Sequence, residues 1–422
     1  MKILTEQFER LLKIEWRRDV QVLLGSSVLS QIFVLAAIPF VTRIYTPESY
    51  AVLATLMAIS VIGGLAAPLG FDFAVPVVRE KDVAISLSTF GLISAGLIGT
   101  GVAVIATIMP LKVMIMLLGA QVGGEYPWLV GAPIVLTAWS AILEALQVRR
   151  RAFRAIGMAR VVQAFVGVFA QIALGLAGWG TVGLVLGYIL MLAVPCLFHA
   201  ASLWSPNLVG TVKWRNITKD IKSQRQYFQY TAPEAFSNAV AVHGPILLIG
   251  LYNDAAALVA HLSLAIRLLQ APSYLVAKAG SQIIQGSMHH WERQGQLNIK
   301  IKNIAMRYAK VGALLGLAVA IIAPIAAVPI LGESWKLTGW TISLLVPSIV
   351  LYLVSYPLIS IGYLKNNNKS MLGLTLVSAM MRMSLCAVAL PHGDAAILVA
   401  FAGGAAVQYA LLVVFLLGSA NR

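Results

Sequence analysis

Long runs of apolar residues recur along the whole sequence. A helix that crosses a bilayer needs about 20 mostly apolar residues, because the hydrocarbon layer is about 30 Å thick and each residue adds about 1.5 Å. Only helices and closed barrels can satisfy their backbone hydrogen bonds there. The 422-residue chain has twelve such runs, at 20–42, 49–71, 83–109, 127–147, 160–178, 181–204, 231–252, 255–284, 310–331, 337–359, 371–391 and 395–418. The sequence therefore predicts an all-α polytopic membrane protein with about twelve transmembrane helices.

The composition agrees with this prediction. Hydrophobic residues make up 59% of the chain and charged residues 11%, with a mean hydropathy of +0.85. A soluble domain carries about 45–50% apolar and about 25% charged residues. The composition therefore excludes an ordinary soluble enzyme, a disordered tail protein and a coiled coil.

The basic residues are unevenly distributed between alternate loops. With the N-terminus placed in the cytoplasm, 25 of the 31 Lys and Arg residues fall in cytoplasmic segments, as the positive-inside rule requires. We therefore expect both termini to be cytoplasmic and the basic loops to contact anionic membrane lipids. Nucleic acid is not expected as a partner, because these loops lack interleaved aromatic side chains. Three basic residues fall outside, and three lie within spans: Arg267, Lys278 and Arg382.

The chain reads as two similar halves of six spans each. Ser30, Pro39, Tyr45 and Pro68 recur about half a chain later, as Ser237, Pro245, Tyr252 and Pro272. Because six is even, both halves start on the same side, as parallel repeats do. We expect an amphipathic inner-surface segment at 1–19, an N-lobe at 20–204, a basic linker at 205–230 and a C-lobe at 231–422.

Several kinds of chemistry are not encoded in recognisable form. The chain has no Walker A motif, and its G-x-G-x-x-G match at 178–183 joins two apolar runs and reads as a tight turn. The two cysteines lie in different spans without metal-ligand spacing, so neither a cofactor nor a metal is expected. The predicted outer loops are short, whereas a membrane glycan polymerase or ligase is expected to carry a large one.

The charged residues inside the membrane are the best candidates for a site. Arg267 lies 12 residues from the outer start of its run, and Arg382 lies 12 residues from Ser370 at the inner edge. Both are near mid-membrane, where a charge is costly and usually faces a polar interior. Lys278 lies nearer the inner interface, where it either meets substrate or extends to the headgroups. Arg267 could instead pair with Glu234 as a structural strut. For Arg382 both roles, contact with substrate and structural support, stay open. Two such cations favour an anionic substrate held by charge-assisted contacts.

Carboxylates near these runs are the candidates for binding a coupling ion. They are Asp72, Glu144 and Glu234. Two of them have an alternative, purely structural role, because Glu144 lies one turn from Arg149 and Asp72 lies close to Arg79. Each could be a salt bridge at the edge of the membrane.

Particular segments resemble those of a transporter family. Residues 26–31 and 38–39, the segment Thr42–Tyr50 and residues 69–74 are similar to the first hairpin of bacterial O-antigen and capsule oligosaccharide flippases. Residues 227–233 and the segment Ala265–Pro272 resemble the corresponding second-half motif. These Wzx-type flippases form a branch of the multidrug/oligosaccharidyl-lipid/polysaccharide exporter superfamily. The chain departs from the family pattern at Tyr50 and at Ala256–Ala257, where glycine is usual.

The resemblance implies two six-helix lobes around a central cavity. It also implies translocation of an undecaprenyl-diphosphate-linked oligosaccharide across the bacterial inner membrane, by alternating access coupled to an ion gradient. In that reading Arg267, Arg382 and Lys278 attract the diphosphate, and Pro39, Pro245 and Pro272 are hinges. A polymerase and glycosyltransferases of the same pathway are possible partners. The alternatives are a drug or cation antiporter of the same superfamily, a glycan polymerase or ligase, and a non-transporting scaffold.

Overall fold

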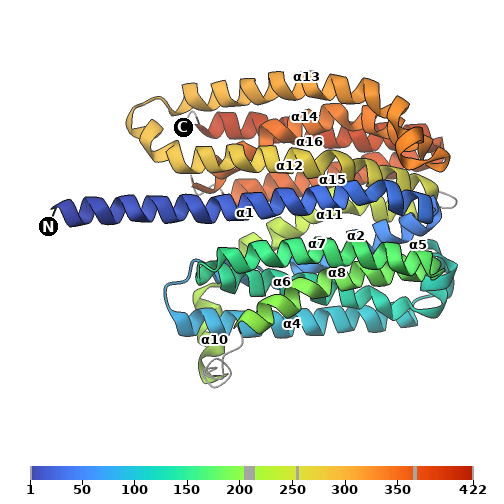
Figure 1. Cartoon of the computed structure of the whole chain (residues 1–422), viewed down its shortest axis with the longest axis horizontal. Helices are drawn as coiled ribbons and strands as arrows, with labels where there is room; N and C mark the ends of the chain where they lie inside the picture. The colour runs from blue at the N-terminus through green and yellow to red at the C-terminus, as the bar shows by residue number, and fades with distance from the viewer. Residues whose placement is uncertain (1, 204–213, 253–255, 365–367, 421–422) are drawn as a thin grey trace.

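The computed structural model describes residues 2–203, 214–252, 256–364 and 368–420. All regular elements in this part of the chain are helices, and the long ones lie side by side along one axis (Figure 1). The first half contains α1 (Lys2–Ile44), α2 (Pro47–Ala66), α3 (Phe71–Ala74), α4 (Lys81–Ile108), α5 (Leu111–Glu125), η1 (Pro127–Val130), α6 (Gly131–Arg149), α7 (Phe153–Leu176) and α8 (Gly180–Leu203). The second half contains α10 (Trp214–Ser223), η2 (Tyr227–Thr231), α11 (Ala232–Gly250), α12 (Ala256–Arg293), α13 (Leu297–Leu331), η3 (Glu333–Trp335), α14 (Lys336–Leu364), α15 (Asn368–Ala389), η4 (Leu390–His392) and α16 (Asp394–Ala420).

Eleven described helices are long and apolar enough to cross a membrane. The twelfth expected run, 231–252, corresponds to α11, a 19-residue helix packed between α2 and α15. It is less apolar than the others because it carries Glu234, Asn238 and His243. The prediction of an all-α protein with about twelve transmembrane helices is thus confirmed.

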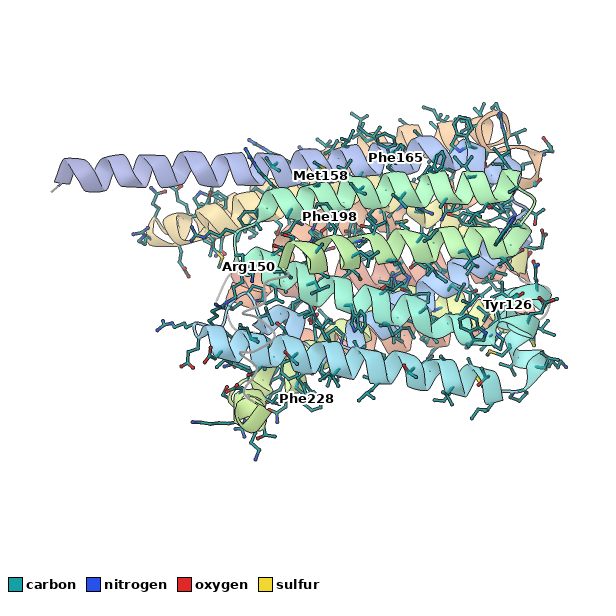
Figure 2. All side chains as sticks on the ribbon, turned by 60° about the horizontal axis from the view of Figure 1, so that its bottom comes forward. Tyr126, Arg150, Met158, Phe165, Phe198 and Phe228 are labelled. Atoms are coloured by element: carbon teal, nitrogen blue, oxygen red, sulfur yellow. The ribbon has the colours of Figure 1, made fainter. Side chains whose placement is uncertain are left out.

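The outer surface of the bundle is apolar, as a lipid-facing surface must be. Met158 and Phe165 lie on the exposed face of α7 (Figure 2). Leu197 on α8 is 70% exposed. Such a large apolar surface would be a liability in water. In a bilayer it is the expected state, because lipid tails replace water around it.

The helices form two groups of six. We call α1, α2, α4, α6, α7 and α8 the N-lobe, and α11 to α16 the C-lobe. Apart from α2, which packs on α11 and α12 as well as on α6 and α8, the helices within each group pack mainly on one another. The expected surface segment 1–19 is not set off by a break, since α1 runs from Lys2 through the first span to Ile44 as one helix. Its location on a membrane surface stays a prediction, as do the lobe boundaries. In the expected linker 205–230, residues 205–213 lie outside the described residues, and α10 packs on α4.

The two ends of the bundle differ in chemistry. We call the end with residues 44–47, 177–180 and 332–335 the hairpin end. The opposite end, with residues 79–81, 149–154 and 293–300, is the basic end, and there α1 begins and α16 finishes (Figure 1). The first hairpin is short because Thr46 caps α2, its Oγ1 accepting from the Ser49 amide at 3.4 Å, and Pro47 is preset for the first helical turn.

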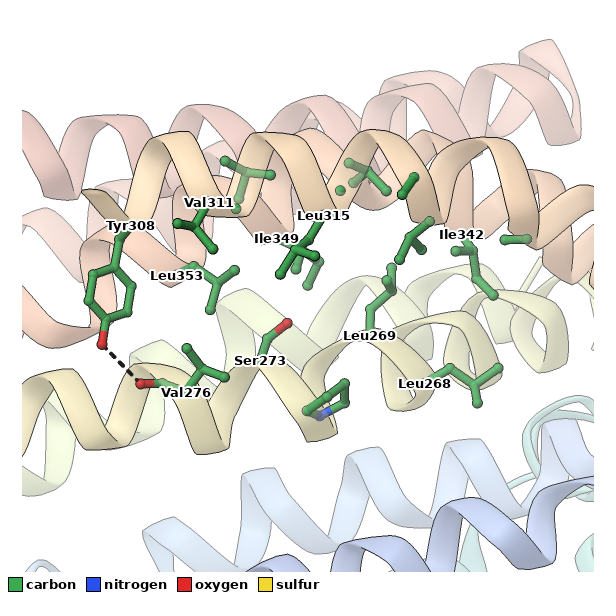
Figure 3. A pocket seen from close by; sticks show the side chains of 18 of the residues that line it. Leu268, Leu269, Ser273, Val276, Tyr308, Val311, Leu315, Ile342, Ile349 and Leu353 are labelled. Atoms are coloured by element: carbon green, nitrogen blue, oxygen red, sulfur yellow. Dashed lines mark hydrogen bonds between the residues drawn. The ribbon is translucent and has the colours of Figure 1, made fainter. Parts of the chain in front are cut away.

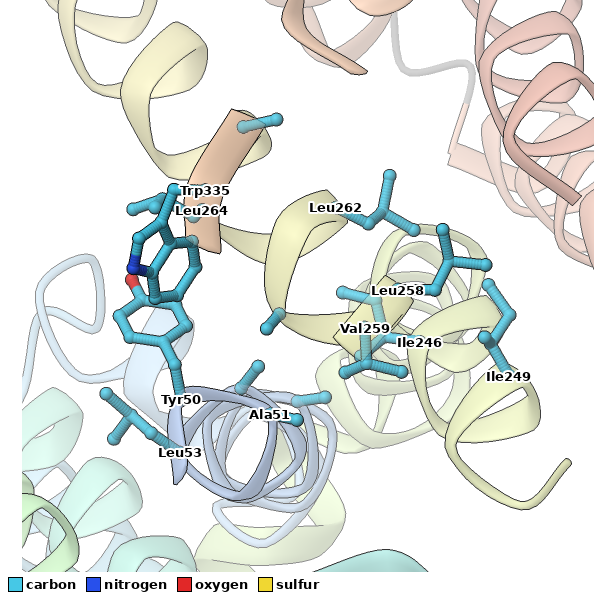
Figure 4. Packing of buried hydrophobic residues seen from close by; sticks show 14 of the residues in the cluster. Tyr50, Ala51, Leu53, Ile246, Ile249, Leu258, Val259, Leu262, Leu264 and Trp335 are labelled. Atoms are coloured by element: carbon cyan, nitrogen blue, oxygen red, sulfur yellow. The ribbon is translucent and has the colours of Figure 1, made fainter. Parts of the chain in front are cut away.

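The largest hydrophobic cluster joins the two lobes near the hairpin end. There α2 of the N-lobe packs on α11 and α12 of the C-lobe (Figure 4). Small side chains at Ala51, Ala54 and Ala58 recur on the buried face of α2, which lets the helices approach closely. Close packing of this kind is what holds helices together in lipid, where burial of apolar area gives little net gain. The lobes are therefore joined at the hairpin end.

Candidate functional site

Arg267 lies at the junction of the lobes. Its helix α12 begins at Ala256, so the residue lies about 16 Å along the helix, at about 1.5 Å per residue. Its Nη1 donates to the Tyr50 hydroxyl of α2 at 3.3 Å. Together with residues of α1 and α7, including Val34 and Gln171, it lines a small space of about 10 Å³. The side chain of Arg267 therefore points from the C-lobe into the N-lobe.

An aromatic group closes the junction on the hairpin side of Arg267. Trp335 is fully buried, its Nε1 donates to the Thr42 carbonyl at 2.9 Å, and its ring meets that of Tyr50 edge-on at 5.4 Å (Figure 4). Arg43 of α1 donates from Nη2 to the Pro329 carbonyl of α13 at 3.1 Å. These contacts cross from one lobe to the other. We call Thr42, Arg43, Tyr50 and Trp335 the hairpin-end seal.

A larger space separates the lobes at the basic end. It has a volume of about 480 Å³ and is lined by α2 and α3 on one side and by η2, α11 and α15 on the other. Its polar lining includes Glu234 and Asn238, and the Lys369 ammonium lies 5.8 Å from the centre of the Tyr230 ring nearby. The structure is thus sealed at the hairpin end and hollow at the basic end.

Glu234 and Arg267 lie in different places. Glu234 is in the first turn of α11 and lines the basic-end pocket, whereas Arg267 lines the small space near the seal. The Arg267 contact shown is with Tyr50. The alternative of an Arg267–Glu234 strut is therefore not what the structure contains.

Glu144 forms an ion pair, but with a different arginine from the expected one. The Arg160 Nη2 of α7 lies 2.6 Å from the Glu144 Oε1 of α6, and the Arg160 Nη1 donates to the Ser27 hydroxyl of α1 at 2.9 Å. The expected partner, Arg149, turns away and donates to the carbonyls of Val75, Val78 and Arg79. The reason is that Arg160 lies across the α6–α7 contact and completes a network with α1.

Asp72 stands in a different environment. It lies on the one-turn helix α3, between two spans, and its buried Oδ1 makes no hydrogen bond in the described part of the chain. Burial raises the pKa of this carboxyl from 3.8 to about 6, and the backbone hydrogen bonds of Asp72 and Phe73 oppose this only in part. The expected edge pair with Arg79 is not formed: in the described part of the chain Asp72 makes no ion pair, and its Oδ1 makes no hydrogen bond.

Arg382 is buried in the interior of the C-lobe. It is 2% exposed, its Nη1 donates to Gln408 Oε1 of α16 at 2.8 Å, and its guanidinium stacks over the Phe401 ring at 4.9 Å. Its Nε is buried without a hydrogen-bond partner in the described residues. In this conformation Arg382 therefore contacts side chains of its own lobe rather than an open space between the lobes.

A row of tyrosines starts at Lys278. The Lys278 ammonium lies 5.4 Å from the centre of the Tyr274 ring, which meets Tyr356 at 5.5 Å. Tyr356 meets Tyr352 at 5.5 Å, and Tyr352 meets Tyr409 at 5.4 Å. The row therefore crosses from α12 through α14 to α16. Sequence reasoning missed it; the spacing of Tyr352 and Tyr356, one helical turn apart, was the available signal.

The three prolines proposed as hinges all lie inside continuous helices. Pro39 is in α1, Pro245 in α11 and Pro272 in α12. A proline in a helix interior removes one backbone hydrogen bond and favours a kink. The hinge role of each stays a prediction.

Comparisons with known proteins place the chain in a family. Residues 40–339 match the family model described as polysaccharide biosynthesis protein. A search of curated protein sequences finds no match.

Solved structures show the same fold. An inward-facing multidrug resistance MATE family transporter of the MOP superfamily has a TM-score of 0.69 at 14% identity, over 93% of this chain and 95% of that one. The lipid II flippase MurJ in an inward closed conformation has a TM-score of 0.68 at 12% identity, over 96% and 87%. An outward-facing MATE transporter has 0.51 at 14% identity, over 96% and 98%. With the family model covering most of the sequence, the chain belongs to the polysaccharide biosynthesis protein family, and it shares its fold with these MATE transporters and with MurJ.

Proposed function

We propose that this transporter is a flippase for undecaprenyl-diphosphate-linked oligosaccharide. It moves the lipid from the inner to the outer leaflet of the bacterial inner membrane, for O-antigen or lipopolysaccharide synthesis, with both termini in the cytoplasm. The observation that carries the proposal is Arg267, a cation at the junction of the lobes that makes no ion pair in the described part of the chain. Membership of a polysaccharide biosynthesis family supports the choice of substrate.

The positive charges act at different depths. The guanidinium of Arg267 can hold a phosphate oxygen with two N–H groups, and such contacts strengthen where water is excluded. Lys278 lies nearer the basic end of the same helix and meets the headgroup first. Arg382 is buried beside Tyr409, the last tyrosine of the row, so its contribution in this conformation is a positive field rather than a contact with substrate.

Alternating access follows from breaking one set of contacts between the lobes and forming another. The hairpin-end seal opens while the basic-end pocket closes, and Pro39, Pro245 and Pro272 are the places where the helices bend. Among the coupling candidates, Asp72 is best suited to carry a proton, because its pKa of about 6 lies near physiological pH. Glu144 is already paired with Arg160. Glu234 lines the basic-end pocket, where it would meet an ion from that side.

A reconstituted assay tests the proposal. Purified protein in liposomes is given a fluorescent undecaprenyl-diphosphate-linked saccharide, and its arrival in the opposite leaflet is measured. We expect Arg267→Gln to lower the rate about tenfold to hundredfold, the value of a charge-assisted hydrogen bond, and Arg267→Lys to retain part of it. Arg150→Gln, in an exposed loop at the basic end, is the matched control.

The same variants are then tested in a flippase-null strain. Normal surface glycan at normal protein levels with both Arg267→Gln and Arg382→Gln would contradict the assignment. A polymerase and glycosyltransferases of the pathway are the proposed partners, so the strain supplies them.

The second candidate is an ion-coupled drug or cation antiporter of the same superfamily. The likeness of the fold to multidrug MATE transporters favours it. It requires a carboxylate that faces a cationic substrate, and Glu234 is a carboxylate that lines the basic-end pocket. Drug efflux that depends on Glu234 and leaves lipid-linked saccharide untouched would select this alternative.

A further inference from the structure

A deep apolar groove runs along the outside of the C-lobe. Helices α12 and α13 each pack on α14 but scarcely on one another, so α14 forms the floor and the other two form the walls. The groove has a volume of about 690 Å³ (Figure 3). Gly312 and Gly316 keep α13 close to the floor, since a Cβ at Gly316 would lie 2.7 Å from Val346 Cγ1.

The groove faces lipid rather than another part of the protein. Leu315 and Val319 of α13 line it and are 60% and 38% exposed. The neighbouring residues Leu314 and Ile325 are 71% and 73% exposed, so this side of α13 meets the bilayer. An occupant must therefore be an apolar chain that arrives from the membrane.

One end of the groove is polar and positive. Tyr308 donates from its hydroxyl to the Val276 carbonyl at 3.2 Å, which bridges the two walls near the basic end (Figure 3). Arg307, which is exposed, lines the groove at the same place. An apolar channel with a guanidinium at one end is complementary to an amphiphile whose headgroup is anionic.

The length of the groove favours one kind of chain. On α13 the lining extends from Arg307 to Ala323, which is about 24 Å at about 1.5 Å per residue. The whole hydrocarbon layer is about 30 Å thick, so an acyl chain of an ordinary phospholipid, confined to one leaflet, reaches about 15 Å. A polyprenyl chain is long enough to fill the groove.

The position of the groove also relates it to the lobe junction. Leu268 and Leu269 line the groove and directly follow Arg267, which turns to the other side of α12 and meets Tyr50. A chain held in the groove thus stays in the membrane beside the helix whose opposite face carries the proposed headgroup contact.

We propose that this α12–α13–α14 groove binds the polyprenyl chain of the lipid-linked substrate. When the substrate arrives from the inner leaflet, its phosphate lies beside Arg307. The proposal rests on the proposed function and adds a second binding place to it. Bulk lipid is as apolar as the groove, so the selectivity comes from the fit of the chain and from the phosphate–guanidinium contact.

Photolabelling tests the groove directly. The full-length protein, in nanodiscs of phosphatidylethanolamine and phosphatidylglycerol, is irradiated with a diazirine-bearing polyprenyl phosphate, and the labelled peptides are identified by mass spectrometry. We expect the label on α12, α13 and α14 at groove-lining residues. Label spread evenly over lipid-facing helices, or displaced equally well by phosphatidylglycerol, would overturn the proposal in favour of an ordinary lipid site.

Two matched pairs of variants sharpen the result. Leu315→Trp fills the groove and should abolish the groove label, whereas Leu314→Trp, on the adjacent lipid-facing position, should not. Arg307→Gln should weaken labelling about tenfold, and Lys302→Gln, which does not line the groove, should leave it unchanged. Equal labelling of both members of a pair contradicts the proposal.

Transport measurements separate this proposal from the function on which it rests. Arg267→Gln should lose transport and keep the groove label. If Leu315→Trp loses the label but transports normally, the groove is a lipid site that transport does not use, and the flippase function stands. If the wild-type protein moves no polyprenyl-linked saccharide at all, the function itself fails.

Discussion

At the scale of residues, the most unusual feature is Arg382, a charge in the C-lobe interior with a neutral partner. Gln408 accepts one hydrogen bond, Phe401 supplies a ring face, and Nε has no partner in the described residues. A buried charge without an opposite charge costs several kcal/mol. A residue retained at that cost is a candidate for function rather than for stability.

Thermal unfolding of variants in detergent tests this account of Arg382. Arg382→Met removes the charge and keeps the volume, so we expect an unchanged or higher Tm together with reduced transport. Gln408→Leu removes the acceptor of the Arg382 Nη1, and we expect a loss of about 1.5–3 kcal/mol. The double variant should regain the stability lost by Gln408→Leu. A large loss of Tm in Arg382→Met alone would show that the arginine is a structural strut.

Asp72 gives a second prediction at this scale. Its pKa is raised in the folded state to about 6, so the folded protein holds a proton that the unfolded chain releases above pH 4. Stability from this group is therefore complete below about pH 4 and declines as the pH rises through 6. Asp72→Asn removes this decline of stability with pH, because asparagine does not titrate. The Tm difference between variant and wild type should be larger at pH 8 than at pH 5, and an equal difference at both values would contradict the raised pKa.

At the scale of elements, α1 and α12 combine two roles each. Helix α1 reaches from the basic end to the seal and carries Pro39 five residues before its last residue. Helix α12 presents Arg267 to the lobe junction on one face and lines the lipid-facing groove on the other. A bend in either helix therefore moves contacts between the lobes.

Replacing Pro39 tests the hinge role. Pro39→Ala restores a backbone donor and allows a straighter helix, so we expect unchanged or higher thermal stability and slower transport. Pro324→Ala, inside the lipid-facing helix α13, is the control, with the same backbone change and normal transport. If both variants transport equally well, Pro39 is not a hinge.

At the scale of the whole molecule, the lobes are sealed at the hairpin end and separated by a pocket at the basic end. The fold agrees better with the inward-facing transporter, with a TM-score of 0.69, than with the outward-facing one, with 0.51. The orientation that the basic loops predict places this pocket on the cytoplasmic side. The seal then sets how often the protein opens outward.

Weakening the seal should shift this equilibrium. Trp335→Phe removes the hydrogen bond to the Thr42 carbonyl, whose net value is about 0.5–1.5 kcal/mol, so the open population should rise roughly twofold to tenfold. Val41→Cys, at a position 5% exposed beside Arg267, reports the opening through its rate of thiol labelling. The two native cysteines are buried and give a low background. An unchanged labelling rate in the Trp335→Phe background would mean that Trp335 does not hold the seal.

The sequence by itself determined the helices and their number, because apolar runs of membrane length can satisfy their backbone only as helices. Its local motifs also identified the family that the comparison confirms. Only the tertiary structure decided which side chains meet. Arg267 reaches Tyr50 rather than Glu234, and Glu144 binds Arg160 rather than Arg149, because these pairings depend on how helices distant in sequence are packed. Spacing along one helix predicts a shared face, but the partner on that face is set by the other lobe or the next helix.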